Sequence, residues 1–361
     1  MILWSGSEHG VAAAYNVRLV PIQFGPVPLA QAMGKRLGHD LTAADGSRPL
    51  RKGRILTAED VELLRSLGRS VVYVAEPGPD DIEEDAAALR LARAAAGDGL
   101  ALTEAAVGRI CLRATAAGIL RVDTVRVLRI NQIDGVAVAT LPAHAVVREE
   151  QMAATIKIIP FALPEAAVRA AENAAAEGGP LLRLDRLTPR NVSLILSGAG
   201  ASQGRVRNAF EAPLRTRVEA LGSTLQAIDY APLDEEMGEA TMAEALRRHV
   251  AAGATLVLLA GETGVVDRHD LIPRAIERAG GEIGCFGAPV DPGNLLLIGR
   301  LGAASILGLP GCARSPQRNV VDLVLPRMVA GERLGREDIA ALGHGGLCED
   351  VAERPMPRSL D

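Results

Sequence analysis

The second half of the chain alternates short apolar runs with longer amphipathic stretches. The apolar runs have the length and composition of buried strands, and lie at residues 192–196, 224–228, 255–259, 295–299 and 305–309. The amphipathic stretches are predicted to be helices, one ending at Leu221 and others at residues 236–252, 271–279 and 317–329, with a small helix at 336–342. This alternation with short connections predicts a three-layer α/β/α domain with a mostly parallel sheet.

The first half is less regular and predicts a mixed α+β region. Thr57 followed by Asp60 resembles a capping box, so a helix is expected from there to Leu67, ended by Gly68. Further helices are predicted at residues 78–96, 103–117 and 164–177. Strands are predicted at 17–28, 71–75, 119–127, 135–141 and 153–159, a turn-rich hairpin at 34–45, and a connector at 181–190.

The main domain boundary is placed near Thr188-Pro189, where the irregular pattern gives way to strand–helix alternation. The resulting division has a loose extension at residues 1–16, the α+β region at 17–188, the α/β domain at 189–345 and a tail at 346–361.

Composition narrows the class of protein. Apolar residues make up 48% of the 361 residues, which favours a globular fold, while the net charge of −5 and the 2% of aromatic residues argue against a nucleic-acid binder. The four cysteines form no Cys-x-x-Cys pair, which indicates a reduced compartment rather than a zinc ribbon or disulfide framework. No apolar run approaches the roughly 20 residues of a membrane span, and no signal peptide is evident. We therefore expect a cytoplasmic protein without a membrane-bound part.

Three strand-to-helix loops are the candidates for ligand binding, because α/β sheets bind ligands beyond the carboxyl ends of their strands. They span residues 197–204, 260–270 and 310–316, and each contains glycine. The free N–H groups of a first helical turn suit an anion. In the third loop, Arg314 and Ser315 add a guanidinium and a hydroxyl that would hold a phosphate or carboxylate. The central loop follows a buried strand and carries an Asp-Arg-His-Asp cluster at a helix start, so we expect the site there.

Acidic residues are predicted at the same edge. Asp229 and Asp234 follow the second strand, and Asp267 and Asp270 lie in the central loop. Carboxylates beside a phosphate site hold a divalent metal, bond a polar ring or cap helices. For Asp270 the capping and ligand roles are equally open, whereas Asp267 favours contact with a ligand or metal.

Several other residues leave two interpretations open. Lys157 lies in an apolar strand, either exposed at an edge or paired with an acid, and is a candidate anion ligand. Asn131 and Asp134 are either turn residues or face a ligand. Cys312 stands next to Gly311 at a predicted helix start, where a lowered pKa would make a thiolate nucleophile an alternative.

These motifs resemble a known family. Gly261-Glu262-Thr263-Gly264 with Asp267, the acidic loop at residues 229–234, and Leu309-Pro310-Gly311 are similar to motifs of the molybdopterin-binding domain shared by proteins that build and load the molybdenum cofactor. The chain departs from that pattern where Ala260 replaces a glycine and where Cys312-Ala313 replaces the usual Asn-Pro.

The segments Asp291-Pro292-Gly293-Asn294 and Pro310-Gly311-Cys312-Ala313-Arg314-Ser315-Pro316 look like a branch in which this domain often precedes a cytidylyltransferase domain. Residues 51–60 and 153–161 are similar to the first part of the same branch, so the likeness spans most of residues 20–345.

The resemblance implies molybdopterin, or its adenylylated form, as the ligand, with Mg²⁺ and molybdate as further components. It implies that Asp267 is catalytic through a bound magnesium ion, helped by Asp229 or Asp234. The residues expected to contact the pterin cofactor are Gly198, Gly200, Ser202, Asp229, Asp234, Gly261, Glu262, Thr263, Gly264, Arg268, Asp270, Pro310, Gly311, Arg314 and Ser315. A molybdoenzyme or a cytidylyltransferase is the expected protein partner, and the chain is expected to form a homo-oligomer.

The leading functional hypothesis is therefore a molybdopterin-binding protein that inserts molybdate or passes the cofactor on. A non-catalytic cofactor carrier or chaperone is the first alternative. A nucleotidyltransferase is a second, because residues 196–202 are similar to a nucleotide-binding glycine loop, but no lysine follows those glycines. A dehydrogenase is disfavoured because the loop lacks the third glycine of the dinucleotide-binding motif.

Overall fold

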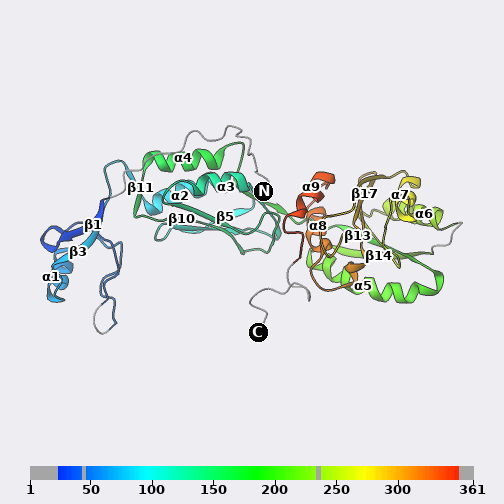
Figure 1. The fold of residues 1–361 in the computed structure, drawn as a ribbon, viewed down its shortest axis with the longest axis horizontal. Coiled ribbons are helices and arrows are strands. Elements are labelled where there is room, and N and C mark those ends of the chain that lie inside the picture. The colour runs from blue at the N-terminus through cyan, green and yellow to red at the C-terminus, as the bar shows by residue number, and fades with distance from the viewer. Residues whose placement is uncertain (1–22, 43–45, 233–236, 349–361) are drawn as a thin grey trace, which may run out of the picture. The chain divides into compact units, whose positions relative to one another are not determined.

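A computed structural model describes residues 23–42, 46–232 and 237–348 of the chain (Figure 1). The chain divides into two compact units, residues 1–185 and 186–361, and each is described here by itself. The predicted extension at residues 1–16 and Asp234 lie outside the described residues, as does most of the predicted tail.

The first part of unit 1 is a small antiparallel sheet with one helix. Its strands are β1 (Gln23–Pro28), β3 (Val71–Glu76) and β2 (Arg36–Leu37), in the order β1-β3-β2, with the short helix η1 (Leu29–Gln31) after β1. Helix α1 (Ala58–Ser66) begins at the predicted capping box: Asp60 N–H donates to Thr57 Oγ1 over 3.3 Å, and Thr57 N–H donates to Asp60 Oδ2 over 3.0 Å.

The rest of unit 1 is built on a four-stranded antiparallel sheet. Its order is β5 (Leu100–Leu102), β6 (Arg109–Ala114), β10 (Met152–Ile158) and β8 (Val136–Thr140). Helices α2 (Glu84–Ala95), α3 (Thr124–Asn131) and α4 (Glu165–Ala176) share one hydrophobic core with this sheet. Two smaller sheets complete the unit: β4 (Asp81–Glu83) with β11 (Ala162–Pro164), and β12 (Leu182–Arg186), β7 (Gly118–Val122) and β9 (Val146–Val147).

Several expectations for unit 1 were wrong. The predicted helix at residues 103–117 contains strand β6, in which Ile110, Leu112 and Ala114 are buried and the residues between them are not. That alternation has the two-residue period of a strand, which the helix prediction overlooked. Helix α2 begins at Glu84 rather than at residue 78, because β4 precedes it. Residues 119–127 split between β7 and α3, and the supposed connector contains β12.

Unit 2 is a six-stranded α/β sheet, which confirms the predicted fold class. The order is β14 (Thr224–Pro232), β13 (Asn191–Gly198), β15 (Leu256–Gly261), β18 (Ala304–Gly308), β17 (Leu297–Leu301) and β16 (Glu282–Phe286). The first four strands are parallel, and β17 and β16 are antiparallel to their neighbours.

Helices cover both faces of this sheet. Leu194, Leu196 and Leu258 pack in a core with α5 (Gln203–Ala220) and α8 (Val320–Val329). Ile195 and Val257, the alternate positions, pack in a second core with α6 (Gly238–Ala251) and α7 (Leu271–Arg278). Because both faces are covered, the strands read as continuous apolar runs. The sequence missed β16 and placed the start of α8 at residue 317, whereas residues 311–314 form the short helix η3 (Gly311–Arg314) and α8 begins after Asn319.

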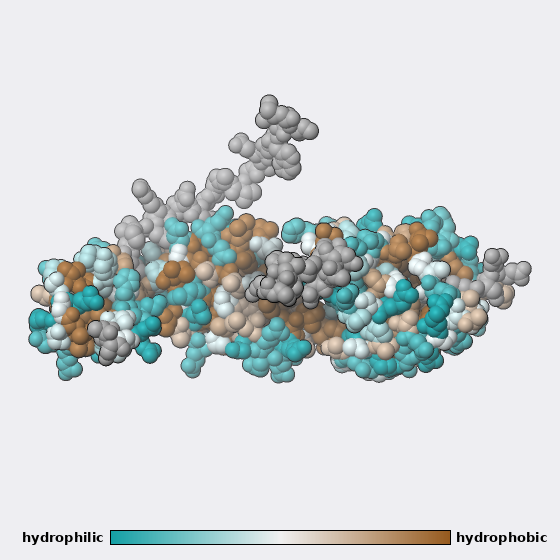
Figure 2. Space-filling model, turned by 60° about the horizontal axis from the view of Figure 1, so that its bottom comes forward, coloured by the Kyte–Doolittle hydropathy of each residue, from teal (hydrophilic) through white to brown (hydrophobic). Residues whose placement is uncertain are grey.

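The face shown in Figure 2 is mainly hydrophilic, with separate hydrophobic patches on it. In the described parts of the chain, no helix has the length and apolarity that crossing a bilayer requires.

Candidate functional site

The three predicted loops leave the sheet of unit 2 at the same edge. In the strand register Ser197 of β13 lies opposite Gly261 of β15, and Leu259 of β15 lies opposite Gly308 of β18. Since β13, β15 and β18 are consecutive parallel neighbours, residues 197–204, 260–270 and 310–316 follow one another along that edge. We refer to these three loops together as the rim.

Two hydrogen-bond donors of the first loop, Ala199 N–H and the Ser202 hydroxyl, are occupied by Glu262 of the second. Its carboxylate accepts from Ala199 N–H over 3.1 Å and from the Ser202 hydroxyl over 2.9 Å, and it pairs with Arg205. These three groups lower the pKa of Glu262 despite its partial burial. The carboxylate therefore stands where an external anion would be held by the amide, the hydroxyl and the guanidinium.

Two glycines are required for this contact between loops. A Cβ at Gly198 would lie 2.8 Å from the Tyr230 hydroxyl and 2.9 Å from Glu262 Oε2, and one at Gly261 would lie 2.5 Å from Ser197 Oγ. No larger residue fits at either position without displacing its neighbours. By contrast, a Cβ at Gly200 would meet nothing within 4 Å.

The acidic residues of the central loop hold that loop's own backbone. Asp270 Oδ2 accepts from Val266 N–H over 2.7 Å and from Asp267 N–H over 3.2 Å, while Asp267 Oδ1 accepts from His269 N–H over 2.7 Å. Asp270 occupies the N-cap position of α7, but its side chain makes no capping hydrogen bond to that helix. Within residues 23–42, 46–232 and 237–348, no group of three or more His, Cys, Asp or Glu side chains is arranged to hold a metal ion.

Other hydrogen-bond donors of the central loop have no acceptor within the described part of the chain. Among the described residues, nothing accepts a hydrogen bond from the backbone amides of Thr263 and Gly264, and the Arg268 side chain has no ion-pair partner. These groups are donors available to a negatively charged ligand.

The third loop is held by an arginine that the sequence analysis did not single out. Arg217 of α5 donates to the carbonyl of Ser315 over 2.8 Å and to that of Gln317 over 3.1 Å, and it pairs with Asp322 at 2.8 Å. Arg314 donates only its Nε, to the Gly311 carbonyl over 2.9 Å. Its terminal amino groups make no hydrogen bond within the described part of the chain, and the guanidinium carbon lies 5.8 Å from the centroid of the Phe210 ring.

The thiolate alternative for Cys312 is wrong. Burial raises the pKa of this thiol to about 11, so it is protonated at neutral pH and is not an activated nucleophile. Ser315 Oγ accepts from Gln317 N–H over 3.1 Å and can still donate its own proton.

Asp229 does not lie in a loop after the second strand, as the sequence suggested, but within β14 opposite Ile195. It pairs with Arg248 and lies 3.4 Å from His249 Nε2. Burial acts to raise the pKa of Asp229, but the hydrogen bonds from Arg248 and Tyr230 N–H and the charges of Arg248 and His249 together outweigh it, and the pKa is lowered. The next residue, Tyr230, reaches the rim instead, where its hydroxyl donates to the Ala199 carbonyl over 2.7 Å.

The sequence left two interpretations open for Lys157 and Asn131 of unit 1, and both side chains form contacts within that unit. Lys157 pairs with Glu84 at 3.3 Å, which favours the paired interpretation over the edge-exposed one. The Asn131 side chain lies at the end of α3 and bridges both backbone groups of Val138, at 2.9 and 2.7 Å. These bonds favour a structural role for Asn131 over contact with a ligand.

The Glu262 contact predicts a gain of anion binding when the carboxylate is removed. Glu262→Ala should expose Ala199 N–H and the Ser202 hydroxyl, so phosphate at constant ionic strength should raise the melting temperature of the variant more than that of the wild type. Glu244→Ala, which removes a carboxylate exposed on α6, is the charge-matched control. An equal phosphate response in all three proteins would contradict the prediction.

The same contact has a predicted pH dependence. Because the folded-state pKa of Glu262 is depressed below 4.5, its contribution to stability is present above the unfolded-state value and is lost as pH falls through the folded-state pKa. The difference in stability between Glu262→Ala and the wild type should shrink over that acidic interval.

A family model matches a segment of unit 1, whereas the similar solved structures cover most of the chain. Residues 26–76, in unit 1, match a domain of unknown function, DUF8806. A comparison with curated proteins finds no match. Among solved structures, a molybdenum cofactor biosynthesis protein from Pyrococcus furiosus is similar, at 14% identity and a TM-score of 0.23, over 88% of this chain and 65% of that protein. The chain therefore spans slightly less than two thirds of that protein's length.

Two structures of a molybdopterin biosynthesis moeA protein from Pyrococcus horikoshii are similar as well. One is 13% identical with a TM-score of 0.29, over 85% of this chain and 75% of that protein. The other is 12% identical with a TM-score of 0.26, over 90% and 76%. Because these sequence identities and TM-scores are low, the function has to follow from the residues of the rim.

Proposed function

We propose that the rim of unit 2 binds a molybdopterin-related ligand and that the chain acts in molybdenum cofactor biosynthesis. The observation that carries the proposal is the convergence of three glycine-bearing loops on one edge of a parallel sheet, fixed by the register of β13, β15 and β18. Such an edge binds ligands in α/β sheets generally. The motifs in these loops resemble those of the molybdopterin-binding domain, which supplies the identity of the ligand.

The residues with open donors support a ligand that carries a phosphate. The Thr263 and Gly264 amides and the Arg314 amino groups can each donate to phosphate oxygens, and charge-assisted hydrogen bonds of this kind are stronger than neutral ones. Ala199 N–H and the Ser202 hydroxyl of the first loop can join them only when Glu262 leaves these two donors. Phosphate contacts should therefore come first from the second and third loops.

Isothermal titration under anaerobic conditions with molybdopterin and its adenylylated form tests the proposal. We expect saturable binding of at least one form. The proposal would be refuted if neither form gave heat on titration and neither shifted the melting temperature of the protein. Adding ATP, Mg²⁺ and molybdate to the loaded protein then separates the two candidate roles. A transferase that inserts molybdate turns over under these conditions, whereas a carrier holds its ligand unchanged.

Arg314→Ala should weaken binding of the phosphorylated pterin about tenfold, because one charge-assisted contact is lost. Titration of the variant measures the change. Arg300→Ala is the matched control, since Arg300 lies opposite Ser305 at the other edge of the sheet and pairs with Glu282. An Arg314 variant that binds as the Arg300 variant does would place the phosphate elsewhere.

A further inference from the structure

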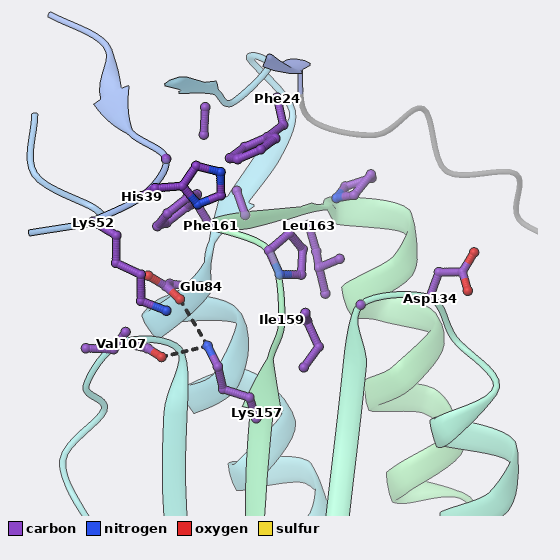
Figure 3. Close-up of a pocket in the computed structure, with 16 residues that line it drawn as sticks. Phe24, His39, Lys52, Glu84, Val107, Asp134, Lys157, Ile159, Phe161 and Leu163 are labelled. Carbon is purple, nitrogen blue, oxygen red and sulfur yellow. Dashed lines mark hydrogen bonds and ion pairs between the residues drawn. The ribbon is translucent and has the colours of Figure 1, made fainter. Parts of the chain in front are cut away.

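A separate cavity of about 650 Å³ lies within unit 1, lined only by residues of that unit (Figure 3). Its volume is in the range of pockets that hold small organic ligands. The segment that matches the domain of unknown function contributes Gly38, His39, Lys52 and Ala75 to its lining. None of its lining residues belongs to the rim.

One side of the cavity is aromatic. The rings of Phe24 and His39 meet edge to face, with centroids 5.3 Å apart, and Phe161 lines the cavity beside them in Figure 3. The chain has only four phenylalanines, so two of the four line this one cavity. Gly38 makes the arrangement possible, because a Cβ there would lie 2.7 Å from the Phe24 ring. The wall is therefore shaped by the backbone as well as by side chains.

Large apolar side chains in this cavity remain exposed to solvent. Phe24 is 48% exposed, Val107 57% and Ile159 62%. Exposed apolar residues scattered singly need no explanation, but here they line one concavity. An apolar or aromatic ligand would cover them.

The cavity also contains an ammonium group with no acidic partner. Two of the three lysines of the chain line it, but they differ in their contacts. Lys157 is neutralised by Glu84 and donates to the Val107 carbonyl over 2.7 Å, as Figure 3 shows. Lys52 is exposed, and no carboxylate within the described ranges forms an ion pair with its Nζ. Lys52, Lys157 and Glu84 therefore leave one net positive charge.

The backbone positions of these groups are fixed before any ligand arrives. Lys52 N–H donates to Asp40 Oδ1 over 2.8 Å, and Arg36 holds the next carbonyl, that of Gly53, over 3.1 Å. Arg36 also pairs with Glu83 at 2.6 Å, next to Glu84. Such pre-organisation reduces the entropic cost of binding.

Val107 adds an observation of a different kind. Its φ is +52°, a conformation that is rare for a β-branched residue and that the surrounding structure must impose. Gly108 follows with φ +66°, and a Cβ there would lie 2.7 Å from Lys157 Nζ. Backbone strain of this kind concentrates at binding and catalytic sites. Here the strained backbone keeps the Val107 side chain in the cavity lining and the Val107 carbonyl in contact with Lys157 Nζ.

We propose that this cavity is a second binding site, for a flat aromatic molecule that bears one anionic group. The ring system lies against Phe24, His39 and Phe161, and the anionic group pairs with Lys52. Asp134 also lines the cavity, but its side chain is turned away from these groups in Figure 3. The proposal does not depend on the function of the rim.

A pair of fluorescent probes tests the proposal on the full chain. 8-Anilinonaphthalene-1-sulfonate is an aromatic anion with a flat naphthalene ring, and N-phenyl-1-naphthylamine is the same ring system without the sulfonate. We expect saturable binding of the sulfonate. Lys52→Met should weaken that binding about tenfold, as expected for loss of one charge-assisted contact, and should leave the neutral probe unaffected. Phe24→Ala, at an exposed position that tolerates truncation, should weaken both probes.

Lys35→Met is the matched control, because Lys35 pairs with Glu76 and does not line the cavity. It should bind both probes as the wild type does, with all variants showing the same far-UV circular dichroism. Absence of saturable sulfonate binding would overturn the proposal, as would binding that neither Lys52→Met nor Phe24→Ala changes. Equal loss of both probes in Lys52→Met would overturn the assignment of the anionic group.

Discussion

Arg126→Met is expected to lower the free energy of unfolding by about 3 kcal/mol, because it leaves one buried and three partly buried carbonyl hydrogen bonds without a donor. Arg126 is 9% exposed and lies on α3. Its guanidinium donates to the carbonyls of Ala175 over 3.0 Å, Glu177 over 2.6 Å, Gly179 over 2.8 Å and Pro180 over 3.0 Å. The last carbonyls of a helix have no partner within it, so this side chain completes the end of α4.

Urea unfolding followed by far-UV circular dichroism measures the loss for Arg126→Met. Because the chain has two units, hydrogen exchange should assign the loss to residues of unit 1. Arg169→Met is the control on α4 itself: its side chain is 72% exposed and lies 3.9 Å from Glu165. That change should cost less than about 0.5 kcal/mol, as exposed ion pairs do. Equal losses in the two variants would show that Arg126 does not support the helix end.

Arg217→Met is expected to lower the stability of unit 2 by about 2–3 kcal/mol, since partly buried carbonyls and a carboxylate lose the partner that a largely buried guanidinium supplies. The Arg217 side chain is 10% exposed and pairs with Asp322 at 2.8 Å. It also holds the carbonyls of Ser315 and Gln317, so the third loop of the rim should exchange its amide hydrogens faster in the variant. If the rim binds the pterin as proposed, its affinity should fall together with the order of that loop.

The control for Arg217→Met lies on the same helix. Arg207 pairs with Glu211 at 2.7 Å, and its side chain is 50% exposed. Arg207→Met should change stability by less than about 0.5 kcal/mol and leave exchange in the third loop as it is. Unchanged exchange in that loop in Arg217→Met would show that other contacts fix its conformation.

Much of unit 2 could be predicted from the sequence because its elements are locally determined. The runs at 192–196 and 255–259 are apolar throughout, and the structure places them in β13 and β15, covered on both faces. Local chemistry also predicted the start of α1, where Thr57 and Asp60 exchange hydrogen bonds three residues apart. The helix prediction failed where it overlooked a period of two, as in β6.

The candidate site was predictable only in part. Strand order and register brought the loops to one edge, as the general rule for parallel sheets implied. The contact of Glu262 with Ser202 and Arg205 spans about 60 residues of sequence, and no local pattern announces it. One signal was present for the cavity of unit 1, since lysines and phenylalanines are rare in this chain and several of them line it.

By itself, the sequence determined the α/β class of unit 2, most of its strands and helices and the three glycine-bearing loops that leave one edge of its sheet. Those features follow from periodicity, turn residues and capping, which act over a few neighbouring positions. Only the tertiary structure decided which charges are already paired: Glu262 with the first loop, Lys157 with Glu84 and Arg217 with the third loop. Pairing depends on distances between segments far apart in the chain, and those distances are set by the packing of the whole unit.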